Sequence, residues 1–494
     1  MVGVNIVSSI RSKVINKLLK FEKQFFDNHS AGELGSLLTN DTSLIANLIT
    51  SSIPELITSV LSVMLVLVSL FILSSTLSIT LLILLPLTLL IFIPLGNVLA
   101  KLSLQNQIYL GELNQFSNFI TINSDFIKDN TTQNHEETRG KQLIQALRDI
   151  GAKQVKYMSI ITPVLSFFLM LIILIVLTLG VYLISLEKLT VGSLVAYILL
   201  TLEILNPVTS TVSNLTALKV LKSAVSRIDT VLEDNQVEDI DTYSDLPTLH
   251  FNRLELRNVS FGYPDNEGVL TLKNINFSVN CGEIVAIVGP SGSGKSTLMD
   301  LITRKYKTDY GDILLNDKVI QDYGLQEVRA NISYVSQNNT LLKGTVKDNL
   351  LYGITKFVPE DEILFVSKLT NFDSVINKLD NGLQFEINAG ESNLSEGEIQ
   401  RLSITHALLE NTSLLLLDEV TSALDAENEQ KIIDTLTQLS PQKCILLTAH
   451  RLSTVKKANK IIFLENGLVT GVGTHEELFA THSQYRKYVL TQFD

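Results

Sequence analysis

The residue types and spacing that suit phosphate chemistry occur in the second half of the chain, in the segment IVAIVGPSGSGKSTLMDLI that begins at Ile284. An apolar run leads there into a glycine-rich loop and then into a helical stretch. Gly289 and the run Gly294–Ser296 fit the pattern GxxxxGK[ST], in which backbone N–H groups surround phosphates, the lysine reaches the β/γ oxygens and the hydroxyl ligates Mg²⁺. The residues that we expect to bind ATP in this loop are Gly289, Pro290, Ser291, Gly292, Ser293, Gly294, Lys295, Ser296 and Thr297.

Two adjacent carboxylates follow another apolar run, SLLLLDE at Ser413–Glu419. The pattern predicts a buried strand that ends in an acidic pair. Asp418 suits a Mg²⁺ ligand, directly or through water, and Glu419 suits a general base that orients an attacking water, as phosphoryl transfer requires. An acidic pair after a strand is usually a solvated loop, but the phosphate-binding loop earlier in the chain favours the catalytic interpretation.

Short strands and helical stretches alternate around these motifs, which predicts an α/β domain at 251–494. A polar, acidic linker at 236–250 precedes it. The net charge of −12 argues against nucleic acid as a partner, because nucleic-acid binding needs a basic face. Cys281 and Cys444 show no metal-ligand spacing, so we expect buried free thiols.

The first 235 residues predict a transmembrane domain. No charged residue occurs from Leu56 to Ala100, a length of roughly 68 Å as helix, whereas a bilayer core is about 30 Å thick. The predicted spans are 56–74, 77–100, 159–184 and 191–214. Lysine and arginine are concentrated in segments 1–55 and 101–156, which places both in the cytoplasm by the positive-inside rule.

Glu203 is the one acidic residue deep in a predicted span. Because a charge at the bilayer centre is costly, we expect its side chain to face the bundle interior or a water-filled cavity. It would then lie on a substrate pathway. The alternative is a protonated group, or a helix–helix hydrogen bond beside Pro207.

Further motifs give the chain its resemblance to a known family. LSEGEIQRL at Leu394–Leu402 resembles the signature LSGGQ-x-QR of ABC ATPases, and FGYP, YVSQ, SALD and LLTAHR follow the family's order and spacing. Over almost its whole length the chain is similar to fused membrane–ATPase ABC exporter half-transporters. The resemblance implies an adenine-stacking Tyr263, a Gln337 that senses Mg²⁺ and γ-phosphate, an Asp425 that works across a dimer and a switch histidine, His450.

The signature departs from the family pattern, because Glu396 and Glu398 replace a glycine and a glutamine. In the family, Ser395 and Gly397 of one subunit would meet the γ-phosphate held by the other subunit. Ser395 and Glu398 form an S-x-x-E capping box that favours a helix start, although the carboxylates of Glu396 and Glu398 add negative charge near a bound anion. The loop FEINAGES at Phe385–Ser392 also departs from the family's TEVGERG-like sequence.

The region Phe25–Ile45 resembles the first intracellular loop of these exporters, and Ile122–Glu137 occupies the place of the second. In the family such loops carry coupling helices that dock on the ATPase domain. A family half-transporter has six spans, so we expect the first two to be absent here. A miscalled start codon, a truncated gene and a hairpin supplied by another chain all remain open.

The expected fold is therefore an α-helical transmembrane bundle followed by an α/β P-loop ABC ATPase domain. The expected function is ATP- and Mg²⁺-dependent export of a small amphipathic molecule, lipid or peptide across the cell membrane. We expect a multi-pass homodimer or heterodimer with its ATPase domain in the cytoplasm. The alternative is a non-transporting ATP-binding membrane regulator or a truncated remnant, whose cells would keep the same efflux after Glu419→Gln.

Overall fold

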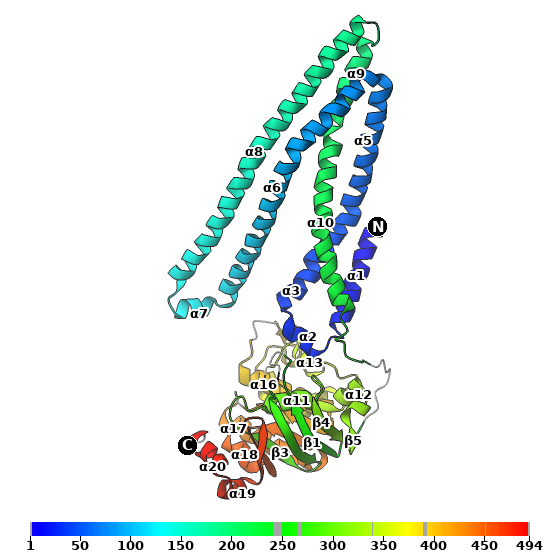
Figure 1. The fold of residues 1–494 in the computed structure, drawn as a ribbon. Helices are drawn as coiled ribbons and strands as arrows, with labels where there is room; N and C mark the ends of the chain where they lie inside the picture. The colour runs from blue at the N-terminus through cyan, green and yellow to red at the C-terminus, as the bar shows by residue number, and fades with distance from the viewer. Residues whose placement is uncertain are drawn as a thin grey trace. The chain divides into compact units, whose positions relative to one another are not determined.

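The computed structural model describes residues 2–240, 249–264, 268–337, 339–388, 393–421, 423–449 and 451–492. Two compact units divide the chain: the first comprises Met1–Ile15 and Gly32–Glu233, and the second comprises Asn16–Ala31 and Asp234–Asp494. Figure 1 shows that the first unit is built from long helices, whereas the second contains β-strands and shorter helices. A helical unit and an α/β unit, in this order, are the architecture expected from the sequence.

Helices and helical turns make up most of the described residues of the N-terminal half. Its elements are α1 (Val2–Leu18), α2 (Lys23–Asn28), α3 (Ala31–Ser36), the π-helical turn η1 (Leu37–Asp41), α4 (Thr42–Asn47), the π-helical turn η2 (Leu48–Ser52), α5 (Ile53–Leu73), α6 (Ser75–Ile122), α7 (Ser124–Asp129), α8 (Gln133–Ser185), α9 (Val191–Glu203) and α10 (Leu205–Glu233). Figure 1 shows α6 beside α8 and α5 beside α10.

Some of these helices have an apolar composition that suits a bilayer. Among the described residues, the helical stretches Ala31–Leu73 and Gln133–Ser185 are long and apolar enough to cross a membrane, and α9 is a shorter apolar helix. The chain turns between α5 and α6, because Ser74 leaves the helical region with φ −161° and ψ 108°. Its side chain accepts a hydrogen bond from the Leu77 amide, which caps α6.

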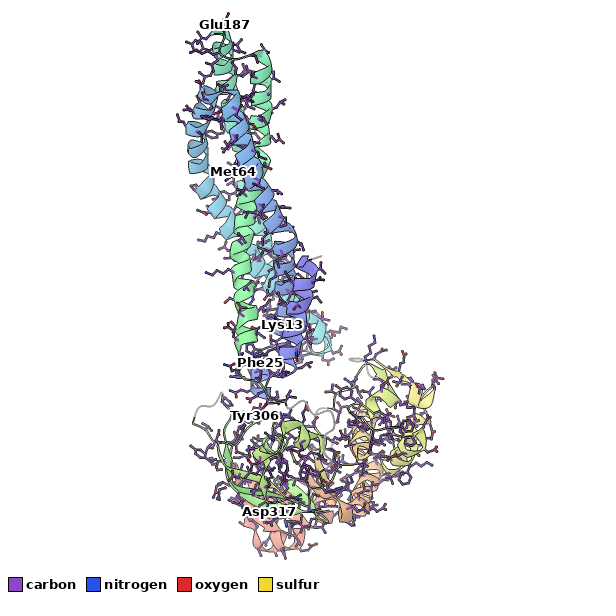
Figure 2. The ribbon with its side chains drawn as sticks, turned by 90° about the vertical axis from the view of Figure 1, so that its right-hand side faces the viewer. Lys13, Phe25, Met64, Glu187, Tyr306 and Asp317 are labelled. Atoms are coloured by element: carbon purple, nitrogen blue, oxygen red, sulfur yellow. The ribbon has the colours of Figure 1, made fainter. Side chains whose placement is uncertain are left out.

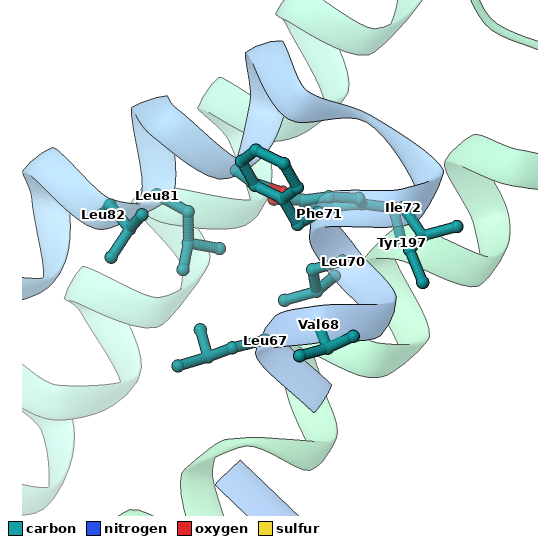
Figure 3. A pocket seen from close by; sticks show the side chains of 9 residues that line it. Leu67, Val68, Leu70, Phe71, Ile72, Leu81, Leu82 and Tyr197 are labelled. Carbon is teal, nitrogen blue, oxygen red and sulfur yellow. The ribbon is translucent and has the colours of Figure 1, made fainter. Parts of the chain in front are cut away.

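A buried polar pair joins α6 to α9 near this turn. Tyr197 is fully buried, and its Oη lies 3.2 Å from Oγ of Ser78. Figure 3 shows the hollow next to this pair, which has a volume of about 290 Å³. Its other lining residues are Leu67, Val68, Leu70, Phe71, Ile72, Leu81 and Leu82.

The second unit contains two larger sheets and a small strand pair. Its strands are β1 (Arg253–Phe261), β2 (Leu272–Asn280), β3 (Ile284–Val288), β4 (Tyr310–Leu315), β5 (Lys318–Val319), β6 (Ile332–Val335), β7 (Gly344–Thr345), β8 (Glu386–Ile387), β9 (Leu414–Leu417), β10 (Cys444–Thr448), β11 (Lys460–Glu465) and β12 (Leu468–Gly473). One sheet has the order β2-β1-β4-β5 and is antiparallel, the other has the order β12-β11-β3-β10-β9-β6, and β7 pairs with β8.

Helices accompany these sheets. They are α11 (Lys295–Ile302), α12 (Leu325–Ala330), α13 (Val346–Leu350), α14 (Glu360–Leu369), α15 (Asp373–Ile376), α16 (Glu396–Glu410), α17 (Ala426–Leu439), α18 (Leu452–Lys457), α19 (His475–Thr481) and α20 (Ser483–Gln492), with 3₁₀ turns η3 (Ile320–Asp322), η4 (Gly382–Gln384) and η5 (Ser440–Gln442). Every residue of β3, β9 and β10 is buried. Burial on both faces explains why these parallel strands read as continuous apolar runs.

Part of the N-terminal sequence packs within the second unit, although its position suggested the membrane domain at 1–235. Phe21 forms an antiparallel bridge with Val237. The Lys307 ammonium lies 2.8 Å from the Glu22 carboxylate, and the Tyr306 hydroxyl donates to Asp27. Figure 2 labels Phe25 and Tyr306, which come from the two sequence segments that meet here.

Candidate active site

The order of strands in the larger sheet brings together motifs that are far apart in the sequence. The neighbours β3, β10, β9 and β6 are parallel, so their carboxyl ends lie at one edge of the sheet. The glycine-rich loop follows β3, Asp418 follows β9 and Gln337 lies shortly after β6. We call these strand ends and the loops that follow them the nucleotide edge.

The glycines of the loop fit a close approach by phosphate. Gly292 and Gly294 have φ of +76° and +104°, in the left-handed region that favours glycine. A Cβ on Gly289 would lie 2.0 Å from the backbone oxygen of Leu464, so a side chain there has no room. Oγ of Ser293 is buried and has no hydrogen-bond partner among the described residues, as expected for a group that awaits a ligand.

The side chain of Lys295, at the start of α11, folds back over the loop. Its Nζ donates to the backbone oxygens of Gly289 at 2.9 Å and Pro290 at 3.1 Å. Burial lowers the pKa of Lys295, while the nearby carboxylates of Glu419 and Asp418 oppose that shift. A largely buried cation therefore stands among the groups predicted to meet phosphate and metal.

The acidic pair is fixed by several hydrogen bonds. Asp418 is 2% exposed, and its Oδ1 accepts from Oγ1 of Thr448 at 2.8 Å. Burial raises the pKa of Asp418, against the hydrogen bonds from Thr448 and Ser296 that lower it. Glu419 has φ +53°, and its Oε2 accepts from Nε2 of Gln337 at 2.8 Å. The structure thus brings Asp418, Glu419, Gln337 and Ser296 together at the nucleotide edge.

Tyr263 is anchored beside the same loop. Its hydroxyl lies 2.9 Å from Oγ1 of Thr297. Its ring centroid lies 5.1 Å from that of Phe261 and 5.4 Å from that of Tyr306, both at steep angles. These contacts fix the ring next to a residue of the phosphate-binding loop.

The signature and the segment before α17 form a second cluster, which we call the signature end. A hollow of about 480 Å³ is lined by Ser395, Glu396, Gly397, Arg401, Ala423, Leu424, Asp425 and Asn428. Gly397 packs closely, because a Cβ there would lie 2.9 Å from the oxygen of Ala423. Asp425 caps α17 by accepting from the Asn428 amide at 2.9 Å.

The predicted capping box is confirmed. Oε2 of Glu398 accepts from both the amide and the hydroxyl of Ser395, each at 2.9 Å. The carboxylate therefore uses the amide and hydroxyl donors of Ser395, a residue that the family resemblance places next to γ-phosphate. Glu396 lies in the same first turn of α16 with an exposed side chain.

Of the remaining predicted residues, one is not described and one lies away from these clusters. His450 lies outside the described residues. Glu203 is the last residue of α9, and its side chain is exposed in the single chain. The helix is interrupted there because Pro207 has no N–H to bond the carbonyl four residues earlier.

Sequence reasoning missed two buried residues that contact the acidic pair. Thr448 bonds both Asp418 and the Glu419 amide. Nε2 of Gln400 donates to the backbone oxygen of Glu419 at 3.1 Å. The only local signal for Thr448 is a hydroxyl at the end of the apolar run CILLT. That run does not indicate that its strand pairs with the strand that precedes Asp418.

The residues of the nucleotide edge fit Mg²⁺ and ATP. The unbonded Ser293 hydroxyl and the glycine backbone could hold phosphate oxygens. Ser296, Asp418 and Gln337 supply oxygen ligands of the kind that Mg²⁺ prefers. Bound Mg²⁺ would neutralise phosphate charge.

Comparison with known proteins identifies the class of protein that this fold and site define. Residues 1–208 match the model of the ABC transporter transmembrane region, and residues 272–422 match the model described as ABC transporter. The chain belongs to the ABC transporter family. It is a membrane protein in which a cytoplasmic ATPase domain drives export.

Particular relatives extend over nearly the whole chain. It is 30% identical over 490 residues to the multidrug resistance ABC transporter ATP-binding and permease protein of Lactococcus lactis subsp. lactis (strain IL1403), covering 99% of this chain and 82% of that protein. It is 32% identical to the ATP-dependent lipid A-core flippase of Haemophilus influenzae (strain 86-028NP), covering 100% and 84%. The fold is similar to the structure of a bacterial Atm1-family ABC exporter with ATP bound, with a TM-score of 0.82, 24% identity and coverage of 99% and 86%.

Proposed function

We propose that the chain is one subunit of a dimeric ABC exporter that uses Mg·ATP to export a small amphipathic molecule, lipid or peptide. Half-transporters of this family generally act as dimers. In the proposed complex, the nucleotide edge of one subunit holds ATP, and Ser395 and Gly397 of the second subunit complete the site. The second subunit is either another copy of this chain or a related half-transporter.

One observation carries the ATPase part of the proposal. The nucleotide edge brings together the Lys295 ammonium, the Asp418 carboxylate, which could bind a metal, and the Glu419 carboxylate, which could act as a general base. Lys295 and Ser296 would hold the β/γ-phosphates and Mg²⁺, with Asp418 as a further metal ligand. Glu419 would orient the attacking water. Its carboxylate accepts a hydrogen bond from Gln337 at 2.8 Å, which would hold it in position. We assign His450 to γ-phosphate sensing, Tyr263 to adenine stacking and Asp425 to contacts across the dimer.

The membrane unit supports an amphipathic substrate. The two relatives named above carry the names of a multidrug transporter and a lipid A-core flippase. In this chain, the hollow beside Ser78 and Tyr197 is mostly apolar with one hydroxyl pair (Figure 3). Glu203 adds a carboxylate at a helix interruption, and we propose that it meets a polar or cationic group of the substrate.

ATP hydrolysis by the purified chain in lipid nanodiscs tests the proposal. Glu419→Gln should reduce turnover by about 10²-fold or more, as loss of a general base does, while binding of a fluorescent ATP analogue remains. Glu362→Gln, which removes an exposed carboxylate from α14, is the matched control and should leave turnover unchanged.

Adding hydrophobic cations, lipids and peptides in turn tests the substrate class. One class should stimulate the Glu419-dependent turnover. Equal turnover by the parent chain and Glu419→Gln, whether alone or with a candidate partner subunit, would contradict the proposed site.

A further inference from the structure

A buried hydroxyl lies on the strand that separates the phosphate-binding loop from the acidic pair. In the larger sheet, β10 lies between β3, which leads into the loop, and β9, which ends just before Asp418. The first four residues of β10 are Cys-Ile-Leu-Leu, and the fifth is Thr448, which is 3% exposed. A polar group at such a site is retained only where it is hydrogen-bonded.

The Thr448 hydroxyl makes one bond as donor and one as acceptor. It donates to Oδ1 of Asp418 at 2.8 Å, and it accepts from the amide of Glu419 at 2.7 Å. The parallel register pairs Leu447 with Leu417, so the residues that follow them emerge side by side. One side chain thus contacts both members of the acidic pair.

The bond to the Glu419 amide has a particular consequence for backbone geometry. With φ +53°, Glu419 occupies the left-handed region that residues other than glycine rarely adopt. The Thr448 hydroxyl supplies an acceptor to its amide, and Gln400 donates to its carbonyl at 3.1 Å. The unusual turn is therefore held at both ends, and the carboxylate it carries reaches Gln337.

We infer that Thr448 is a positioning residue for ATP hydrolysis, whose hydroxyl fixes the Asp418 carboxylate and the Glu419 backbone relative to each other. It acts through these two residues and needs no contact with the nucleotide. The inference rests on the roles proposed above for Asp418 and Glu419. β10 lies between β3, which leads into the glycine-rich loop, and β9, which ends before Asp418. A side chain at the end of β10 is therefore well placed to position the acidic pair.

Comparison of Thr448→Val with Thr448→Ser tests the inference on the full chain in nanodiscs. Valine keeps the shape of the side chain and removes the hydroxyl, whereas serine keeps the hydroxyl and removes a methyl group. Thr448→Val should lower turnover at saturating Mg·ATP by about tenfold or more, as loss of a hydrogen bond to a charged group does. Thr448→Ser should remain within about threefold of the parent. Ile445→Val, which removes a methylene from the same buried strand, controls for packing.

Two binding measurements separate positioning from general damage. Binding of a fluorescent ATP analogue in EDTA should stay within about twofold in Thr448→Val, because the glycine-rich loop is unchanged. Mn²⁺ affinity in the presence of ATP, measured by electron paramagnetic resonance, should weaken in Thr448→Val and recover in Thr448→Ser. If Thr448→Val does not fold, Thr448→Cys replaces it with a similar volume and a much weaker hydrogen-bonding group.

Turnover of Thr448→Val within about twofold of the parent, or equal losses in the valine and serine variants, would overturn the inference. Glu419→Gln, measured in parallel, keeps the proposed function separate. If Glu419→Gln hydrolyses ATP like the parent, the proposed site fails. If it is inactive while Thr448→Val is active, only the role of Thr448 fails.

Discussion

The nucleotide edge and the signature end are held in place by different means. At the nucleotide edge, adjacent parallel strands fix the functional groups, and Asp418 is 2% exposed. At the signature end, Ser395 is exposed at the start of α16, and both of its donors bond Glu398. The sheet therefore positions the groups of the nucleotide edge, whereas at the signature end the Glu398 carboxylate occupies the donors of Ser395. The proposed γ-phosphate contact would require Ser395 to exchange partners.

The largest expected difference between the two clusters concerns their glycines. Gly289→Ala places a Cβ 2.0 Å from a backbone oxygen of β11, and Gly397→Ala places one 2.9 Å from the oxygen of Ala423. We expect Gly289→Ala to weaken ATP binding by at least about tenfold, because backbone must move. Gly397→Ala should leave binding to the isolated subunit nearly unchanged. Titration with a fluorescent ATP analogue checks both, and equal losses would contradict the distinction.

Glu429 is a buried residue of α17, the helix that follows Asp425 of the signature end. Its side chain is 4% exposed and lies 2.7 Å from the Arg451 guanidinium. It also accepts from Ser453 at 2.6 Å and Thr454 at 2.9 Å. Glu429→Ala should destabilise the second unit by about 1–3 kcal/mol, because three donors lose their acceptor.

Thermal unfolding in detergent measures this effect. Glu427→Ala, an exposed carboxylate on the same helix, is the control and should change the unfolding temperature little. Similar shifts in the two variants would show that burial does not distinguish these carboxylates.

Glu398→Gln should raise ATP turnover slightly, whereas the changes described above cause losses. Glutamine preserves the capping geometry and removes the negative charge that competes for the Ser395 donors. ATP-dependent turnover at subsaturating ATP should rise about two- to fivefold, in line with a charge at a helix N-terminus. Glu396→Gln, in the same turn but without this role in the capping box, should change turnover less. A fall in turnover for Glu398→Gln alone would mean that its carboxylate assists the site.

Asp425→Asn should have the smallest effect on stability. Both residue types cap helices well, so the unfolding temperature at pH 7 should barely change. The hydrogen bond from the Asn428 backbone holds the pKa of Asp425 below its ordinary value. Any extra stability from the charged form is therefore present above the ordinary aspartate pKa and is lost as the pH falls through the lowered one. The small difference between the unfolding temperatures of the two proteins at pH 7 should therefore disappear at acidic pH.

Local sequence was sufficient for several parts of the site. The glycine spacing predicted the loop whose Gly292 and Gly294 adopt positive φ. The S-x-x-E spacing predicted the capping box of Ser395 and Glu398. Both succeed because the interacting groups lie within a few residues of one another.

Other features depended on contacts between distant segments. Thr448 stands 30 residues from Asp418 in the chain, and nothing in CILLT tells that β10 inserts between β3 and β9. Composition likewise grouped the N-terminal segment with the membrane domain, although Phe21 pairs with Val237 in the second unit.

The sequence by itself determined that the protein has an apolar helical half, a phosphate-binding loop and an acidic pair after a buried strand. Residue type, spacing and hydrophobic run length are local properties, so they survive without knowledge of the fold. Only the tertiary structure decided which strand lies between the phosphate-binding loop and the acidic pair. It also decided which hydroxyl bonds both members of that pair and which carboxylates are buried. Those outcomes depend on strand order and packing between distant segments, which short-range patterns do not encode.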